Sequence, residues 1–203
     1  MTLNQWILAS NSPRRKELLG LFGQPISVFP ADIDETEFPG EAPSDYVKRL
    51  AHTKAEVIST KFPEAHLIIA ADTTVADQSE ILGKPVNAAD ARRMLTQLRG
   101  KNHQVYTAIS LVVPAKNIWV EELCLTLVPM REYSDEEMDK YIHSGDPMDK
   151  AGAYAIQHRG FHPVSAFNGC FASVMGFPLC HLARGIHQLG LLPDIKINLA
   201  CQN

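Results

Sequence analysis

The segment covering residues 6–15 joins a short apolar stretch to a helix start that carries groups able to bind phosphate. It reads Trp-Ile-Leu-Ala-Ser-Asn-Ser-Pro-Arg-Arg. Its first four residues suit a strand, and Ser12 followed by Pro13 is typical of a helix N-cap and first helical position. Free backbone N–H groups would then face the end of the strand, beside the guanidinium groups of Arg14 and Arg15. The spacing predicts an anion site, and an ordinary capped helix with solvated arginines is the alternative.

A carboxylate follows a second apolar stretch. Residues 66–71 form a near-continuous apolar run typical of a buried strand, and Asp72, Thr73 and Thr74 come directly after it. Open α/β sheets place ligands and catalytic groups at the carboxyl ends of their strands. Asp72 is therefore a candidate catalytic group, with a structural Asp in a turn as the alternative.

Two lysines could supply further positive charge. Lys54 falls inside the apolar stripe of a helix that Ser44 or Asp45 is expected to cap, so it either points into a cleft or lies at the edge of the stripe with its stem over the core. Lys84 stands between a glycine and a proline, and a lysine on such a stiff segment suits a phosphate contact. By contrast, Arg49, His52 and Lys61 are interpreted as solvated.

The segment 30–43 reads as a loop rich in carboxylates, a composition that can hold a metal; its acidic residues are Asp32, Asp34, Glu35, Glu37 and Glu41. Within it, Asp32-Ile-Asp34-Glu-Thr36 matches the D-x-D-x-T pattern of haloacid-dehalogenase-type phosphatases, in which the first Asp attacks phosphorus. Pro30 separates the preceding strand from Asp32, and no clear paired-Asp metal motif follows downstream. A phosphomonoesterase using Asp32 is therefore the alternative enzyme. His158 and His162 have a metal-like interval without a cysteine pair, so we interpret them as histidines of a surface loop.

Composition bounds the remaining classes. The chain has 203 residues, 45% hydrophobic and 21% charged, enough for one core or two lobes that share a cleft within a single domain, residues 1–203. A net charge of -4 argues against a nucleic-acid-binding surface, and no segment approaches a membrane span. The amino terminus lacks the features of a secretory signal, and the four cysteines have no C-x-x-C spacing. A cytoplasmic protein without membrane or nucleic-acid partners is expected.

Local signals also predict the remaining elements. Helices are expected at residues 13–22, burying Leu18, Leu19 and Leu21, at 88–98 after an Asn87 cap, at 135–143 from the capping-box spacing of Ser134 and Glu137, and at 179–189. Strands are expected at residues 26–29, 103–113, 118–128 and 171–175, and the tail after Pro193 is expected to be marginally ordered.

Taken together, these segments resemble the Maf family of nucleoside triphosphate pyrophosphatases, in order and along nearly the whole chain. The matching segments are Leu8-Ala-Ser-Asn-Ser-Pro-Arg-Arg15, Asp34-Glu35-Thr36, Lys54-Ala55, Ala71-Asp72-Thr73, Gly83-Lys84-Pro85, His103 with Val105 and Thr107, Lys150-Ala-Gly-Ala-Tyr-Ala-Ile-Gln157, Asn168-Gly169 and Gly176-Phe-Pro178. The resemblance implies a mixed, twisted α/β sheet with flanking helices and two lobes around a central cleft, as in inosine triphosphatase-like proteins. It also implies a homodimer that cuts a nucleoside triphosphate to the monophosphate and pyrophosphate with a divalent metal, Mg²⁺ or Mn²⁺.

The resemblance also assigns roles. It makes Asp72 the general base and makes Arg14, Thr73 and Gln157 the substrate-selecting positions, with residue types that look like the branch acting on dTTP and UTP. Ser10, Arg15, Glu35, Lys54 and Lys84 match further phosphate and metal contacts of the family. Glu35 and Asp72 are the carboxylates for a metal, and the sequence leaves open which of them takes the proton. From another class, a nucleotide-binding regulator of division without turnover is the alternative, since the family has been associated with septum formation.

Overall fold

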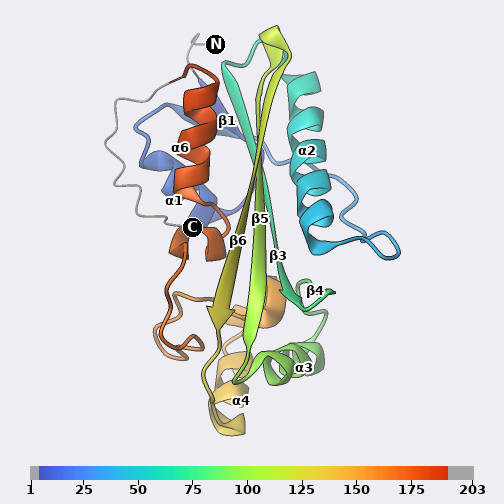
Figure 1. Cartoon of the computed structure of the whole chain (residues 1–203), viewed down its shortest axis with the longest axis vertical. Coiled ribbons are helices and arrows are strands. Elements are labelled where there is room, and N and C mark those ends of the chain that lie inside the picture. The colour runs from blue at the N-terminus through green and yellow to red at the C-terminus, as the bar shows by residue number, and fades with distance from the viewer. Residues whose placement is uncertain (1–4, 192–203) are drawn as a thin grey trace.

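The computed structural model describes residues 5–191, and one mixed sheet runs through the molecule (Figure 1). Its strands are β1 (Trp6–Leu8), β2 (Ile26–Val28), β3 (Leu67–Asp77), β4 (Glu80–Leu82), β5 (Asn102–Val113) and β6 (Ile118–Pro129). The helices are α1 (Pro13–Gly20), α2 (Pro43–Lys61), α3 (Ala88–Leu98), α4 (Asp135–His143), α5 (Phe171–Val174) and α6 (Leu179–Gln188), with short 3-10 turns η1 (Pro114–Lys116), η2 (Asp146–Asp149) and η3 (Ala151–Ala153). The mixed α/β class expected from the sequence is confirmed.

The strand order β2-β1-β3-β5-β6 combines a parallel and an antiparallel part. β1 pairs in parallel with both β2 and β3, whereas β3, β5 and β6 form a long antiparallel meander, and β4 folds back on the end of β3. The pairing of β1 with β3 ends at Leu8 opposite Ile69, and β4 pairs with β3 only from Val75 onward. Between these points one edge of β3 has no strand beside it, and this opening is where the site lies.

Helices cover the sheet differently at its two ends. Around β1 and β2, α2 lies on one face of the long strands and α1 with α6 on the other (Figure 1). Alternation along β1 explains this: Trp6 and Leu8 pack with the cluster that contains Leu19 of α1, and Ile7 packs with the α2 residues of the opposite face. We call this half the first lobe. At the other end of the strands, α3, α4, η2 and η3 pack against β3, β4 and β5 and form the second lobe.

Several predicted elements are confirmed. Asn87 caps α3 through the amide of Asp90, and Gly100, with a φ of 68°, follows its end. Ser134 and Glu137 form the reciprocal capping box of α4. The two long strands β5 and β6 lie within a residue of the predicted limits.

Other predictions were wrong at element ends. α1 stops at Gly20, so Leu21 is 58% exposed and Leu18 only partly buried. α2 begins at Pro43 after Ala42, without a side-chain cap from Ser44 or Asp45. Proline suits the first helical position because its φ is fixed near the helical value and it has no N–H to satisfy.

Two further differences come from pairing and packing. β3 continues to Asp77, since β5 pairs with it from Ile68 to Ala76 and β4 pairs with its end, and Asp72 therefore lies within the strand rather than after it. Residues 171–174 form the short helix α5 instead of a strand, capped by Cys170. The tail after Pro193 lies outside the described residues. Within residues 5–191, no helix is long and apolar enough to cross a membrane.

Candidate active site

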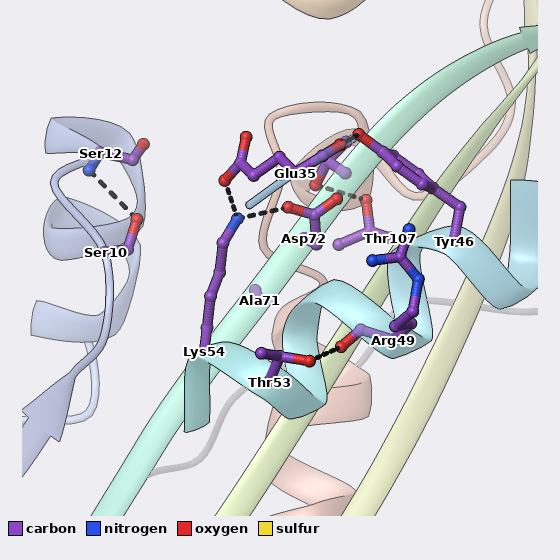
Figure 2. Close-up of polar contacts among 12 residues, drawn as sticks. Ser10, Ser12, Glu35, Tyr46, Arg49, Thr53, Lys54, Ala71, Asp72 and Thr107 are labelled. Carbon is purple, nitrogen blue, oxygen red and sulfur yellow. Dashed lines mark hydrogen bonds and ion pairs between the residues drawn. The ribbon is translucent and has the colours of Figure 1, made fainter. Parts of the chain in front are cut away.

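The loop between β1 and α1 has the predicted capped geometry. Ser12 is the N-cap, and its hydroxyl accepts a hydrogen bond from the Arg15 amide, with Pro13 in the first helical turn. The Ser10 hydroxyl in turn accepts a hydrogen bond from the Ser12 amide at 3.2 Å (Figure 2). These short-range contacts hold the loop at the mouth of the cleft, where its side chains face the open edge of β3.

A cleft of about 840 Å³ lies between the two lobes. It is lined by all nine residues that the sequence singled out for the site: Ser10, Arg14, Arg15, Glu35, Lys54, Asp72, Thr73, Lys84 and Gln157. They come from the β1–α1 loop, the loop before α2, α2 itself, β3, the segment after β4 and the segment after η3. The structure therefore brings together residues that are scattered over most of the chain.

Lys54 joins two of the carboxylates that line the cleft. Its Nζ lies 2.6 Å from Oδ1 of Asp72 and 2.6 Å from Oε1 of Glu35 (Figure 2). Lys54 and Asp72 are 8% and 7% exposed, whereas the Glu35 side chain is 48% exposed. Of the two interpretations of Lys54, the cleft-facing one is confirmed, because two anions compensate the cation that the apolar stripe alone would not tolerate.

The two carboxylates differ in their electrostatic environment. Burial raises the pKa of Asp72 above its ordinary value, and the charges of Lys54 and Arg15 offset part of that rise. Partial burial acts on Glu35 in the same direction, but the hydrogen bond and charge of Lys54, with a contribution from Lys84, hold the pKa of Glu35 below its ordinary value. Such a pair is suited to one group that takes a proton and one that stays ionised.

Arg15 is tied to the protein more closely than the sequence suggested. Its Nη1 donates to the Ala71 carbonyl oxygen at 2.7 Å and to the Ser10 hydroxyl, and its Nε donates to the Gly176 carbonyl oxygen at 2.9 Å. Its Nη2 donates to the Thr73 hydroxyl at 3.2 Å. Arg15 thus satisfies a carbonyl group on the open edge of β3, and enclosure of its guanidinium lowers its pKa.

The second lobe supplies the opposite wall of the cleft. Lys84 is exposed after β4, and the Gly152 amide donates to the Gly83 carbonyl oxygen at 3.1 Å. Gly152 has a φ of 67°, and a Cβ there would come within 2.9 Å of the Val75 side chain, so this close approach requires glycine. The contact joins the segment 150–157 to the segment of Lys84.

Comparisons with known proteins show the family of this chain. A family model described as Maf-like protein matches residues 5–189. The chain belongs to the Maf family. One relative, the dTTP/UTP pyrophosphatase of Citrifermentans bemidjiense, is 44% identical over 92% of this chain and 96% of its own. Another, the dTTP/UTP pyrophosphatase of Myxococcus xanthus, is 45% identical over 91% of this chain and 92% of its own.

A solved structure shares the fold of this Maf family member. The Staphylococcus aureus Ham1 protein matches with a TM-score of 0.52 and 13% identity, over 91% of this chain and 95% of that one. At this identity the match concerns the fold alone. It supports the arrangement of a mixed sheet with flanking helices.

Sequence reasoning missed several residues that shape the Maf site. Lys150, Tyr154 and Tyr46 also line the cleft. The Lys150 ammonium contacts Asp146 and lies 2.6 Å from Oδ1 of Asp149, so acidic partners compensate its charge. The pairing of Lys150 could have been inferred from the sequence, since its acidic partners Asp146 and Asp149 are close to it in the chain. The pairing of Lys54 could not, since Glu35 and Asp72 are distant in the chain.

A chain of hydroxyl groups lies behind the site. The Thr73 hydroxyl lies 3.0 Å from that of Thr107 on β5, and Thr107 donates to the Ser173 carbonyl oxygen of α5 at 3.0 Å. The β3–β5 register places Thr73 directly opposite Thr107. Thr73 is therefore held in place by Arg15 on one side and by Thr107 on the other.

Asp32 and Asp34 of the D-x-D-x-T segment and the pair His158 and His162 do not line the cleft. Asp32 is exposed and is not among the lining residues, and Asp34 forms a turn in which Oδ1 accepts hydrogen bonds from the Thr36 amide and hydroxyl. His158 Nδ1 accepts a hydrogen bond from the Phe161 amide. Among residues 5–191, no three His, Cys, Asp or Glu side chains gather as a metal cluster.

Proposed function

We propose that this Maf family member hydrolyses dTTP and UTP to the monophosphate and pyrophosphate. This reaction would remove unwanted nucleoside triphosphates from the nucleotide pool. The observation that carries the proposal is the buried Asp72 carboxylate in a cleft lined by Arg14, Lys54 and Lys84. One carboxylate among several cations suits the attack of water on a polyphosphate. Relatives named dTTP/UTP pyrophosphatase, 42–45% identical over 91–92% of the chain, support the same activity.

The chemistry follows from the two carboxylates. Asp72 accepts a proton as water attacks the α-phosphorus, and the bond from that phosphorus to the bridging oxygen breaks, releasing pyrophosphate. The raised pKa of Asp72 favours this residue as the base, while Glu35 stays ionised. Arg14, Lys54 and Lys84 offset the negative charge of the phosphates, and Ser10 and Arg15 are proposed as further triphosphate contacts.

The donor set fits a divalent cation. Glu35 and Asp72 converge on one Lys54 ammonium, so their oxygens lie close enough to share one cation. Mg²⁺ is usually held by one or two carboxylates together with substrate phosphates, and Mn²⁺ accepts similar oxygen ligands. Glu35 and Asp72 would hold the metal, which would supply charge neutralisation on the phosphate oxygens.

Substrate selection is proposed for Arg14, Thr73 and Gln157. Arg14 and Thr73 lie on the first lobe and Gln157 on the second, and all three line the cleft. The nucleobase of a substrate bound across the cleft would therefore be contacted from both lobes. Thr73, fixed by Arg15 and Thr107, offers a rigid hydroxyl for this purpose.

Product analysis tests the proposed reaction. Incubation with dTTP and Mg²⁺ should yield dTMP and pyrophosphate, and UTP should yield UMP and pyrophosphate. Release of dTDP and free phosphate would contradict the reaction, and phosphate release abolished by Asp32→Asn would instead support the phosphomonoesterase. Tight nucleotide binding without any product would favour a regulator of division.

A cytoplasmic homodimer is also proposed. The resemblance to the Maf family supports the dimer, and a nucleotide substrate supports the compartment. Analytical ultracentrifugation of the purified chain should give twice the mass of the monomer, and fractionation of cells should recover the protein in the cytoplasmic fraction. A monomeric mass, or recovery elsewhere, would contradict the respective part.

A further inference from the structure

The loop that carries Glu35 has little of the packing that positions Lys54 and Asp72. Residues 29–42 contain no helix or strand, and residues 34–40 are all exposed. Even Phe38, a large apolar side chain within this stretch, is 56% exposed. Packing of this exposed stretch therefore contributes little to the position of Glu35, and polar contacts must place its carboxylate near Lys54.

Two side chains of α2 make such contacts to the backbone of the loop. The Tyr46 hydroxyl donates to the Glu35 carbonyl oxygen at 2.9 Å, and Nη2 of Arg49 donates to the Thr36 carbonyl oxygen at 3.0 Å. Figure 2 shows both side chains on the helix that also presents Lys54. Because the contacts use main-chain carbonyls, they leave the Glu35 carboxylate available to Lys54.

Arg49 also holds the far end of the loop. Its Nε and Nη2 donate to the two carboxylate oxygens of Glu41 at 2.6 and 2.7 Å, a bidentate geometry, and its guanidinium carbon lies 4.0 Å from the centre of the Phe38 ring. Glu41 also accepts a hydrogen bond from the Phe38 amide at 3.1 Å. The expectation that Arg49 is merely solvated was wrong, because one guanidinium contacts the loop at three residues.

We propose that Tyr46 and Arg49 are positioning residues that hold the Glu35 loop so that the Glu35 carboxylate stays close to Asp72. Both stand on α2, one turn apart, and Lys54 follows further along the same helix. One rigid element thus sets the cation of the site and the position of the loop that brings the second carboxylate to it. The inference rests on the proposed function and deepens it: the two residues act through Glu35 on the divalent cation, and Arg49 is not among the residues that line the cleft.

The test combines Tyr46→Phe and Arg49→Ala with Lys48→Ala as the matched control. Tyr46→Phe removes one hydroxyl, and Lys48 is a half-exposed residue of the same helix whose Nζ lies 4.0 Å from Asp45. In both test variants, amide hydrogen exchange of residues 30–42 should become at least about 10-fold faster, with exchange in β3 unchanged. The Mg²⁺ concentration for half-maximal dTTP hydrolysis should rise about 10-fold, a size typical of residues that orient metal ligands. Lys48→Ala should match the wild type in both measurements.

Epistasis separates positioning from other roles. In a Glu35→Ala background, Tyr46→Phe should no longer change the Mg²⁺ dependence, because the residue through which it acts is gone. Wild-type loop exchange in both variants, or faster exchange with unchanged Mg²⁺ dependence, would overturn the inference. If the wild-type chain hydrolyses no nucleotide, the proposed function fails on its own. Mn²⁺ binding followed by electron paramagnetic resonance then decides the inference: weaker binding in both variants supports it, and unchanged binding overturns it.

Discussion

Lys54 Nζ lies 2.6 Å from the Asp72 carboxylate, although Lys54 stands on α2 and Asp72 on β3. The pair is almost fully buried, and its ammonium also reaches Glu35 at 2.6 Å. A buried cation between two carboxylates balances charge within the cleft, which Arg14 and Lys84 also line. This relationship is the centre of the proposed site.

Replacing Asp72 should separate chemistry from folding. Asp72→Asn keeps the shape of the side chain but removes the base, so turnover of dTTP should fall at least about 10²-fold. Steady-state kinetics with pyrophosphate detection would measure it. Asp32→Asn, on an exposed residue outside the cleft, is the matched control and should retain full activity. A near-normal rate for Asp72→Asn would remove it as the base.

The two adjacent arginines should differ in their effect on stability. Arg15→Met leaves the carbonyl groups of Ala71 and Gly176 without their donor, so the free energy of unfolding should fall by about 2 to 4 kcal/mol in urea denaturation. Arg14→Met should change that free energy by less than about 1 kcal/mol while weakening dTTP binding. Equal stability of the two variants would show that Arg15 is not a structural anchor.

Two glycines with nearly the same φ allow steric contact to be measured by itself. Gly152 has a φ of 67° and Gly23 a φ of 66°, but only an added Cβ at Gly152 meets another side chain, Val75 at 2.9 Å. Gly23→Ala should cost about 1 kcal/mol from backbone strain, and Gly152→Ala about 1 to 3 kcal/mol more. Thermal and urea unfolding would compare them. A smaller loss at Gly152 than at Gly23 would contradict the close packing.

Stability should depend on pH through His103. This residue is 2% exposed and hydrogen-bonded through Nε2 to the Tyr154 hydroxyl at 2.8 Å, and burial lowers its pKa from 6.5 to about 4. The unfolded chain therefore binds more protons between these values, and stability present above about pH 6.5 is lost as the pH falls towards 4. The loss attributable to His103 is up to about 3 kcal/mol.

Urea unfolding at several pH values would measure this slope. His103→Gln should show a shallower loss of stability between pH 6.5 and 4 than the wild type. His187→Gln, on an exposed residue of α6, should follow the wild type. Parallel curves for His103→Gln and wild type would mean that His103 is protonated in the folded chain.

Much of the fold follows from local signals, because caps and alternation act over a few residues. The Ser12 cap, the Asn87 cap and the capping box of α4 are each formed within one helical turn. Element ends were less predictable where tertiary pairing overrode local pattern. β3 runs past Asp72 because β5 pairs with it there, and the β-branched residues Thr73, Thr74 and Val75 suit the continued strand.

The sequence by itself determined which side chains are candidates for the chemistry. Residue types and spacing predicted an anion site with Arg14 and singled out Lys54, Asp72 and Lys84, and the family resemblance added Gln157. All five line the cleft. Their chemistry is a property of each side chain, and the surrounding motifs are local, so both can be recognised without coordinates.

Only the tertiary structure decided how those side chains are held. Whether Lys54 faces the cleft depends on anions from β3 and the loop before α2, and whether Arg15 is an anchor depends on carbonyl groups at Ala71 and Gly176. Likewise, the contact of Arg49 with Glu41 turns a residue that reads as solvated into part of the support for Glu35. Such contacts join residues far apart in the chain, and their existence depends on how the strands pair and the helices pack.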